Sequence, residues 1–338
     1  MKNLRFFLTY LLALFFCGVI RISPRFMLRF LAMMGACGVY LIPSSLKLCR
    51  ANIQVAFPDW TPSRTAKIAR RSIYNMILNF LEFIWMSGIP RRIEKVCCLP
   101  VEVYGKVQQC GSEGTRIIFV NPHLGSWETS GLSAPYYGKV ALAAIAKPTS
   151  NKYLNKLISS RREQAGGLQV IFARGAMRAA VKALKSGMCL GTLIDQNTKV
   201  RDGGCLVDFF GLPVASSAAP AVLMRYCRSA NIPAVIFYAV CVRENKRLRV
   251  YLQELAKPFD EYASDQEVIQ ELMRITEDYI RRYPDQYVWL YRRFRYIPRE
   301  ASEAQIKRFP YYAENVKPSF YDRRLRGKSN DSIEMKSL

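Results

Sequence analysis

Residues 117–131 read IIFVNPHLGSWETSG, and this stretch decides how the middle of the chain folds. Its apolar beginning predicts a buried strand, because a short apolar run bounded by turn residues is typical of one. Pro122 and Gly125 indicate a turn, and a helix or turn is expected over 129–135. His123 therefore follows the end of a buried strand, where functional groups of α/β sheets are commonly found.

His123 is the only histidine of the chain, and Glu128 follows it in the same turn region. In a continuous helix this spacing would put the two side chains on different faces, but a turn at Gly125 would let them meet. A histidine beside a carboxylate is the arrangement of a general base, because the carboxylate fixes the tautomer and stabilises the imidazolium. An activated hydroxyl could then attack a thioester without a serine or cysteine nucleophile. Plain packing of a lone histidine is the alternative.

Outward from this stretch, strands alternate with helices, which predicts an α/β fold with a mixed, largely parallel sheet covered by helices. Strands are expected at 101–105, 116–120, 139–146, 168–173, 188–194, 233–240 and 248–252. Helices are expected at 63–86, 151–164, 176–187, 218–231 and 265–284. Thr61 and Pro62 suit the start of the first helix, as a capping hydroxyl followed by a first-turn proline.

The N-terminal residues 1–43 predict a membrane-anchoring or interfacial arm. Residues 6–20 are uncharged, yet this run is shorter than the ~20 residues that a bilayer-spanning helix needs, so tilted or partial insertion fits. A secretory signal peptide is the alternative, but its small-residue cleavage site is missing. The second apolar run, 31–42, predicts an interfacial or core helix. Residues 44–298 then form the main domain, and the polar segment 299–338 predicts a disordered tail.

The charge balance is strongly basic, with 50 Lys and Arg against 26 Asp and Glu and a formal net charge of +24. Such a field favours anionic partners: nucleic acid, an anionic membrane or an acidic protein. None of the ten cysteines has CxxC spacing, which is typical of reduced thiols in a cytoplasm-facing protein. One histidine and no paired cysteines also argue against a structural zinc site.

The run NPHLGSWE resembles the HxxxxD/E motif of the glycerolipid-type acyltransferases. More narrowly, it is similar to the H-x-G-N-W-E motif of the late acyltransferases of lipid A biosynthesis, the lauroyl/myristoyl family, with Ser126 in place of the usual asparagine. The resemblance extends over about residues 21–298 through RANIQVAFPDW, RREQAGG, LKSGMCLGTLIDQN, VDFFGLPVASSAAPA and PDQYVWLYRRFR. The order and spacing of these segments make the match specific, whereas the first motif alone would indicate only the superfamily.

The resemblance implies a glycerolipid-acyltransferase-like fold and a catalytic pair. In it, His123 deprotonates the acceptor hydroxyl and Glu128 orients the imidazole. Arg162, in an R-E-x-x-G context, is expected near the acceptor phosphate or the forming oxyanion, with Arg161 as the fallback, since a guanidinium fork matches phosphate geometry. A solvated helix face is the structural alternative for these arginines.

Further positions follow from the same resemblance. Asp195 and Gln196 are expected to line the pocket, although a turn-forming aspartate is the alternative. Phe209 and Phe210 are expected to shape the pocket or acyl channel, and core packing is the alternative. A basic rim beside the membrane or donor-carrier site is expected from Arg292, Arg293 and Arg295.

The function that the resemblance implies is transfer of a fatty acyl group from acyl carrier protein, which is acidic, to a hydroxyl of a lipid A precursor. The enzyme is expected in the bacterial inner membrane, with its site facing the cytoplasm and no metal or organic cofactor. Alternative acceptors are a lysophospholipid, a phosphatidylinositol mannoside or an aminolipid. A non-catalytic basic membrane-surface or nucleic-acid-binding protein is the alternative from another class, although nucleic acid is not the expected partner. A serine hydrolase is disfavoured, because the chain has no G-x-S-x-G run and no second histidine.

Overall fold

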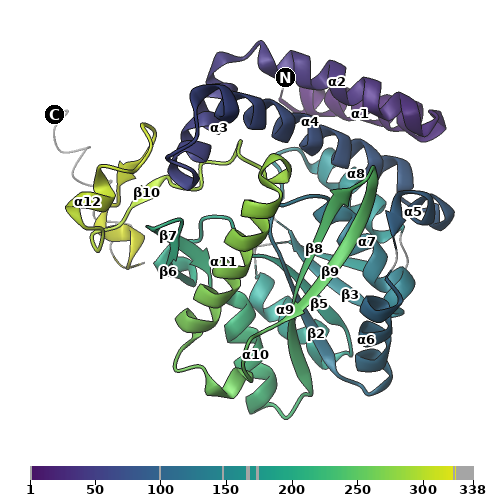
Figure 1. Ribbon diagram of the computed structural model, residues 1–338. Coiled ribbons are helices and arrows are strands. Elements are labelled where there is room, and N and C mark those ends of the chain that lie inside the picture. The colour runs from purple at the N-terminus through teal and green to yellow at the C-terminus, as the bar shows by residue number, and fades with distance from the viewer. Residues whose placement is uncertain are drawn as a thin grey trace, which may run out of the picture.

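The computed structural model describes residues 2–98, 100–146, 148–164, 168–172, 175–322 and 324. A seven-stranded sheet in the order β1-β9-β8-β2-β5-β3-β4 lies at the centre (Figure 1). Its strands are β1 (Cys97–Cys98), β2 (Arg116–Asn121), β3 (Leu142–Ala146), β4 (Leu168–Phe172), β5 (Cys189–Leu193), β8 (Ala234–Glu244) and β9 (Arg247–Glu254). All neighbouring pairs are parallel except the hairpin of β8 and β9, which confirms the mixed, largely parallel sheet.

Helices cover both faces of the sheet, and the side chains of β2 alternate between them. Ile118 and Val120 belong to the core with α9 (Ala176–Lys185), α10 (Ala219–Ser229) and α11 (Asp265–Arg282). Ile117 and Phe119 belong to the second core, with α6 (Val101–Ser112) and α7 (Trp127–Gly138). Burial on both faces explains why the sequence of β2 is continuously apolar instead of alternating.

The N-terminal arm packs against the domain instead of extending away from it. The arm forms α1 (Lys2–Ile22) and α2 (Arg25–Tyr40). The helices that follow it or lie near it are α3 (Pro43–Ala56), α4 (Pro62–Met86), α5 (Pro90–Val96) and α8 (Lys152–Glu163). Figure 1 shows α1 and α2 lying along α4 at one end of the molecule. Side chains of the domain bind the arm's backbone: Asn151 donates to the carbonyl of Phe6 at 3.0 Å, and the Trp85 indole donates to that of Ser23 at 2.9 Å.

One helix in the described part of the chain, over Asn3–Ile22, is long and apolar enough to cross a membrane by length and composition. Only 11% of the most apolar stretch of this helix is buried inside the protein. The helix expected over 31–42 is α2, which buries Leu28, Ala32 and Ala36. Its exposed side chains include Phe26, Phe30, Met33 and Met34. Together α1 and α2 present an apolar surface of the kind that contacts a membrane.

Several helices differ from the sequence-based expectation, among them α6 and α3. Residues 101–105 alternate like a strand over a few positions, but they open α6, whose Tyr104 and Val107 share one buried face at helical spacing. Pro100 precedes this helix, where the fixed φ of proline and its missing N–H do no harm. α3 was not expected from the sequence; Pro43 occupies its first turn, and Cys49, Asn52 and Ile53 are buried on one face.

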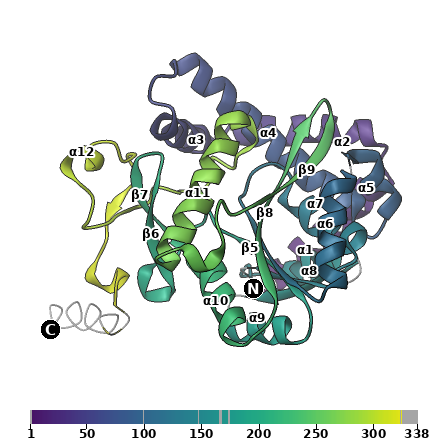
Figure 2. The ribbon, with the colours of Figure 1, turned by 60° about the horizontal axis from the view of Figure 1, so that its bottom comes forward.

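Residues 299–322 differ from the expected disordered tail. They form α12 (Glu303–Ile306) and β11 (Glu314–Asn315), which pairs with β10 (Tyr296–Ile297). Figure 2 shows these elements beside the hairpin of β6 (Gly204–Phe209) and β7 (Leu212–Ser217). The polar composition conceals two aromatic side chains that pack on the core, Phe309 and Tyr312, and a third, Phe320, that is buried against Tyr296. The remainder of that segment, 323 and 325–338, lies outside the described residues.

Candidate active site

His123 and Asp195 meet because each follows one of two adjacent parallel strands, β2 and β5, at the same edge of the sheet. Asp195 Oδ1 lies 2.7 Å from the Nδ1 atom of His123. The backbone N–H of His123 donates to Asp195 Oδ2 at 2.8 Å. One buried carboxylate, only 2% exposed, thus holds both the backbone and the ring of the histidine.

The contact with Asp195 determines which imidazole nitrogen is available for chemistry. A carboxylate accepts hydrogen bonds, so the neutral ring carries its hydrogen on Nδ1 and a lone pair on Nε2. The side-chain amide of Gln196 lies 3.2 Å from Nε2, and its N–H donates to that lone pair. Because Gln196 and His123 both line a large cavity, a hydroxyl group entering there would replace the amide at Nε2.

Electrostatics favour the charged forms of both partners. Burial lowers the pKa of His123, but the charge of Asp195 and the hydrogen bond to it outweigh burial. With a further contribution from the charge of Glu128, the pKa lies above its usual value of 6.5. Burial raises the pKa of Asp195, yet the charge and hydrogen bonds of His123 outweigh it, so this pKa lies below its usual value. Such a pair keeps Asp195 ionised and makes the imidazole a stronger base.

The turn that carries His123 is clamped on both sides. Gly125 has a φ of 62°, and an added Cβ would lie 2.0 Å from the carbonyl oxygen of Cys241, so only glycine fits. The side chain of Asn79, in α4, donates to the carbonyl of Gly125 at 2.8 Å. From the opposite side, the backbone N–H of Gly125 donates to the backbone carbonyl of Gln286 at 2.9 Å, and the backbone N–H of Val288 donates to the carbonyl of His123 at 3.0 Å.

Glu128, in the first turn of α7, pairs with Arg162 of α8. Nε and Nη2 of the guanidinium donate to the two carboxylate oxygens at 2.9 and 2.6 Å. The sequence led us to expect Glu128 at the imidazole, but the structure gives that hydrogen bond to Asp195, because α7 directs Glu128 towards α8. Glu128 nevertheless lines the same cavity as His123 and Arg162. Trp127 packs edge-on against the imidazole, with ring centroids 5.0 Å apart.

The two adjacent arginines of α8 have different environments. Arg162 lines the cavity, and its pKa is affected first by burial, which lowers it, and then by Glu128, which raises it above the usual value. Arg161 donates to Gln164 at 3.1 Å and is not among the side chains that line the two cavities beside His123. The structure therefore places Arg162, and not Arg161, beside the candidate catalytic residues.

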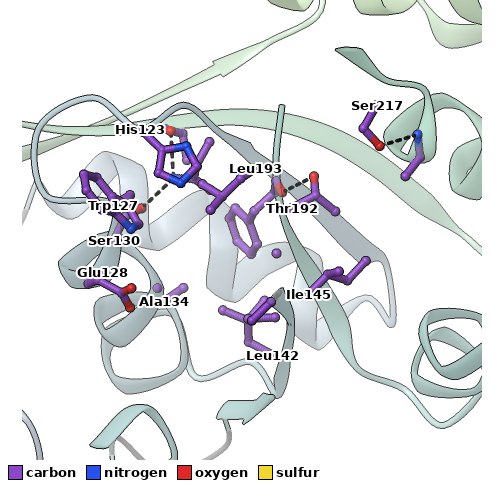
Figure 3. A pocket seen from close by; sticks show the side chains of 18 of the residues that line it. His123, Trp127, Glu128, Ser130, Ala134, Leu142, Ile145, Thr192, Leu193 and Ser217 are labelled. Carbon is purple, nitrogen blue, oxygen red and sulfur yellow. Dashed lines mark hydrogen bonds between the residues drawn. The ribbon is translucent and has the colours of Figure 1, made fainter. Parts of the chain in front are cut away.

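The cavity at His123 has a volume of about 1010 Å³. Figure 3 shows His123, Trp127 and Glu128 on one side, with Leu142 and Ile145 of β3 across from them. Its interior runs between the sheet and the helices α6 and α7, where aliphatic and aromatic residues outnumber polar ones such as Asn121, Ser133 and Thr192. These apolar residues are Val103, Val107, Phe119, Ala134, Leu142, Ala144, Leu168, Ala239, Val250 and Leu252. Such a volume and such walls suit a hydrocarbon chain.

Three other expected positions lie in the core: Phe209 and Phe210 instead of at the pocket, and Arg293 instead of on a basic rim. Phe209 and Phe210 are buried, and their ring centroids lie 4.7 Å apart. Phe209 also packs on Phe294 at 5.9 Å, and neither phenylalanine lines the two cavities beside His123. Arg293 is not on a basic rim: it is 2% exposed and donates to the carbonyl of Ala215 at 2.7 Å. Arg292 and Arg295 are exposed, and Arg295 pairs with Glu314 at 2.6 Å.

Sequence reasoning missed site residues that lie far from His123 in the sequence. Asn79 and Gln286 clamp the turn, and Tyr291 lines the cavity while its hydroxyl accepts from the backbone of Asn197 at 2.9 Å. No local motif distinguishes them from ordinary polar or aromatic residues. Among the described residues, no group of three or more His, Cys, Asp or Glu side chains is arranged to hold a metal ion.

Comparison with known proteins identifies the family. Residues 1–296 match the family described as bacterial lipid A biosynthesis acyltransferase. The chain is 23% identical over 257 residues to the lipid A biosynthesis palmitoleoyltransferase of Escherichia coli (strain K12), an alignment that covers 74% of this chain and 79% of that protein. The same identity and coverage hold for a lipid A biosynthesis acyltransferase of Shigella flexneri. The chain therefore belongs to the bacterial lipid A biosynthesis acyltransferase family and is an acyltransferase.

Proposed function

We propose that the protein transfers a fatty acyl group from acyl carrier protein to a hydroxyl of a lipid A precursor, with His123 as general base. The observation that carries this proposal is the contact of Asp195 with Nδ1, which leaves the Nε2 lone pair at the wall of a cavity with apolar depths. Family membership supplies acyl transfer in lipid A biosynthesis. The donor, the acceptor and the roles of the residues are our assignment.

In this mechanism the acceptor hydroxyl binds at Nε2 of His123 and gives up its proton there. Its oxygen attacks the thioester carbonyl carbon, and a tetrahedral intermediate forms. The C–S bond then breaks, the acyl group stays on the acceptor oxygen, and the leaving thiolate takes the proton from the imidazolium. Asp195 orients the ring and stabilises its charged form throughout.

Glu128 and Arg162 act together in the proposed mechanism. The carboxylate holds the guanidinium beside the cavity through two hydrogen bonds. From there the fixed positive charge stabilises the oxyanion of the intermediate or binds a phosphate of the acceptor. The negative charge of Glu128 also favours the imidazolium, so it supports His123 electrostatically.

The rest of the molecule is consistent with a lipid substrate and an acidic donor. The apolar surfaces of α1 and α2 suit a protein anchored at the bacterial inner membrane, and we assign the catalytic domain to the cytoplasmic side, where acyl carrier protein is found. The net charge of +24 would attract both an anionic membrane and an acidic carrier protein.

The experiment is a transfer assay with membranes that contain wild-type protein, His123→Ala or Arg161→Ala. Labelled acyl–acyl carrier protein is supplied with a Kdo-bearing lipid A precursor and, separately, with a lysophospholipid. We expect wild type and Arg161→Ala to acylate the lipid A precursor, and His123→Ala to be slower by about 10²–10⁴-fold. Transfer to the lysophospholipid alone would move the assignment to another acceptor. Equal activity of wild type and His123→Ala would exclude His123 as the base.

A further inference from the structure

A second cavity, of about 350 Å³, lies next to the active-site turn. It is bounded by α4 on one side and by the turn from His123 to Glu128 on the other, and we call it the α4 groove. Met76, Ile77 and Phe80 of α4 contribute its outer wall, and Val288 closes it beside the turn. His123, Trp127 and Glu128 line both the α4 groove and the large cavity, so the two spaces meet at the candidate base.

The α4 groove is suited to hydrocarbon and not to a charged headgroup. Its apolar and aromatic lining residues are Met76, Ile77, Phe80, Trp127 and Val288, and its other lining residues are Asn79, His123, Ser126 and Glu128. These polar side chains already have partners within the protein. The Asn79 amide donates to Gly125 at 2.8 Å and accepts from Arg243 at 2.8 Å, while Glu128 is bound to Arg162. Little remains there to bind phosphate or sugar.

The α4 groove also adjoins the apolar surface of the N-terminal helices. Ile77 lines the groove, and its side chain lies 3.4 Å from where a Cβ on Gly35 of α2 would stand, so α2 packs directly behind it. Phe80 is 48% exposed, although it is a large apolar side chain at the site. The nearby α2 exposes Phe30 and Met34. The α4 groove therefore lies against a helix whose exposed apolar side chains suit contact with the hydrocarbon of a membrane.

We propose that the α4 groove binds one hydrocarbon chain of the acceptor lipid, while the large cavity binds the acyl chain of the donor. This inference rests on the proposed function. The positions of the two spaces match these two roles. The large cavity extends between the sheet and the helices α6 and α7, whereas the α4 groove lies beside the apolar N-terminal helices, from which a membrane lipid would approach. An acceptor chain held in the groove would bring the lipid's hydroxyl to Nε2 of His123, where the donor thioester ends.

Kinetics of two filling variants test the assignment. Met76→Trp narrows the α4 groove, and Ala144→Phe narrows the large cavity. For Met76→Trp we expect the KM for the lipid A precursor to rise at least about tenfold, since losing about two buried methylene groups weakens binding that much. Its preference among donor chain lengths should not change. For Ala144→Phe we expect the reverse, a shift towards shorter donor chains with the acceptor KM within about twofold of wild type.

A matched pair of variants separates the α4 groove from general membrane contact. Phe80→Gln removes an exposed phenylalanine that lines the groove, and Phe30→Gln removes one from α2 that does not. Only Phe80→Gln should raise the acceptor KM after both proteins are compared at equal membrane-bound amounts. If Met76→Trp alters donor chain selection instead, the groove holds the donor and the assignment is reversed. If neither Met76→Trp nor Phe80→Gln affects acceptor KM, no acceptor chain binds there.

A binding experiment keeps this inference distinguishable from the proposed function. His123→Ala protein in vesicles is irradiated with a lipid A precursor that carries a diazirine in one acyl chain, and the modified peptides are identified by mass spectrometry. Labelling on Met76 or Phe80 is the expected result. Transfer by wild type without labelling of α4 would overturn the inference and leave the function intact. Labelling of α4 when wild type transfers nothing would retain the groove as a lipid site and reject the proposed function.

Discussion

Asp195 accepts two hydrogen bonds from His123, one from the backbone N–H and one from the imidazole, although the two residues are 72 positions apart in the chain. The carboxylate thereby fixes where the ring stands as well as which nitrogen carries the hydrogen. The HxxxxE motif contains a carboxylate of its own, but in this structure Glu128 is engaged by Arg162. The site thus has two carboxylates with separate partners, so substitutions of Asp195 and of Glu128 should have different effects.

Asp195→Asn should retain the fold and lose most of the activity. The amide can keep the shape of the carboxylate, but it offers an acceptor to only one N–H of His123 and removes the negative charge that stabilises the imidazolium. We expect kcat to fall about 10²–10⁴-fold in the transfer assay. Asp260→Asn, in an exposed ion pair with Arg228, is the control and should remain near wild type. Wild-type activity of Asp195→Asn would remove Asp195 from the mechanism.

Activity should depend on pH through a His123 pKa above 6.5. The neutral imidazole is the active base, so kcat/KM should rise as pH increases through that raised pKa and fall below it. Asp195→Asn removes the contribution that raises the pKa while burial still lowers it, and its acidic limb should therefore move to lower pH. The measurement is kcat/KM against pH for both proteins. An unchanged acidic limb in the variant would mean that Asp195 does not control this titration.

Arg162→Lys should reduce kcat/KM by about 10–100-fold, because lysine cannot reproduce the two-pronged contact and a charge-assisted hydrogen bond contributes about 1.5–3 kcal/mol. Arg161→Lys, at the neighbouring position outside the cavity, should have little effect.

The double variant with Glu128→Gln then reveals how Glu128 acts. If it works by holding Arg162, the combined loss should be no greater than the larger single loss. If the fold-losses in kcat/KM of the two single variants instead multiply in the double variant, and the pH profile shifts, Glu128 acts directly on His123.

Gly125→Ala should destabilise the protein and disorder the turn that presents His123. A Cβ at this position would lie 2.0 Å from the Cys241 carbonyl oxygen, and the φ of 62° is unfavourable for alanine. We expect a loss of at least about 1–3 kcal/mol in unfolding free energy and a matching loss of activity. Gly105→Ala, in α6 with nothing within 4 Å of the added Cβ, should be neutral or stabilising. Thermal unfolding in detergent makes the comparison, and equal melting temperatures would contradict it.

Glu82→Gln should be strongly destabilising. Glu82 is 1% exposed, pairs with Arg243 and lies 3.7 Å from Arg25, so its loss leaves two arginines without their buried counter-charge. Breaking such a pair typically costs about 3–5 kcal/mol. Because Arg243 also binds Asn79, which clamps Gly125, activity should fall with stability.

The control for that experiment is Glu254→Gln, in the exposed pair with Lys106 at 2.8 Å. An exposed pair contributes about 0–1 kcal/mol, so the melting temperature should hardly change. A similarly small effect for Glu82→Gln would show that the buried network does not hold the turn.

Much of this architecture could be predicted from the amino-acid sequence alone. The apolar run 117–120 followed by Pro122 predicted strand, turn and the position of His123, because such signals act between residues close together in the chain. The same holds for α4, where Thr61 caps the first turn by accepting from Arg64. Composition was a poorer guide in 299–322, since a few aromatic residues on the core outweigh a polar average.

Only the tertiary structure decided which groups meet. Strand β5 lies between β2 and β3 in the sheet, and that order brings Asp195 to His123 while α7 turns Glu128 towards Arg162. The burial of Phe209 in the core and the apolar cavity on the opposite face of the sheet depend equally on how distant segments pack. A local sequence pattern encodes a strand or a turn, but the partner across a sheet is set by topology and by the competition among all side chains for one interior.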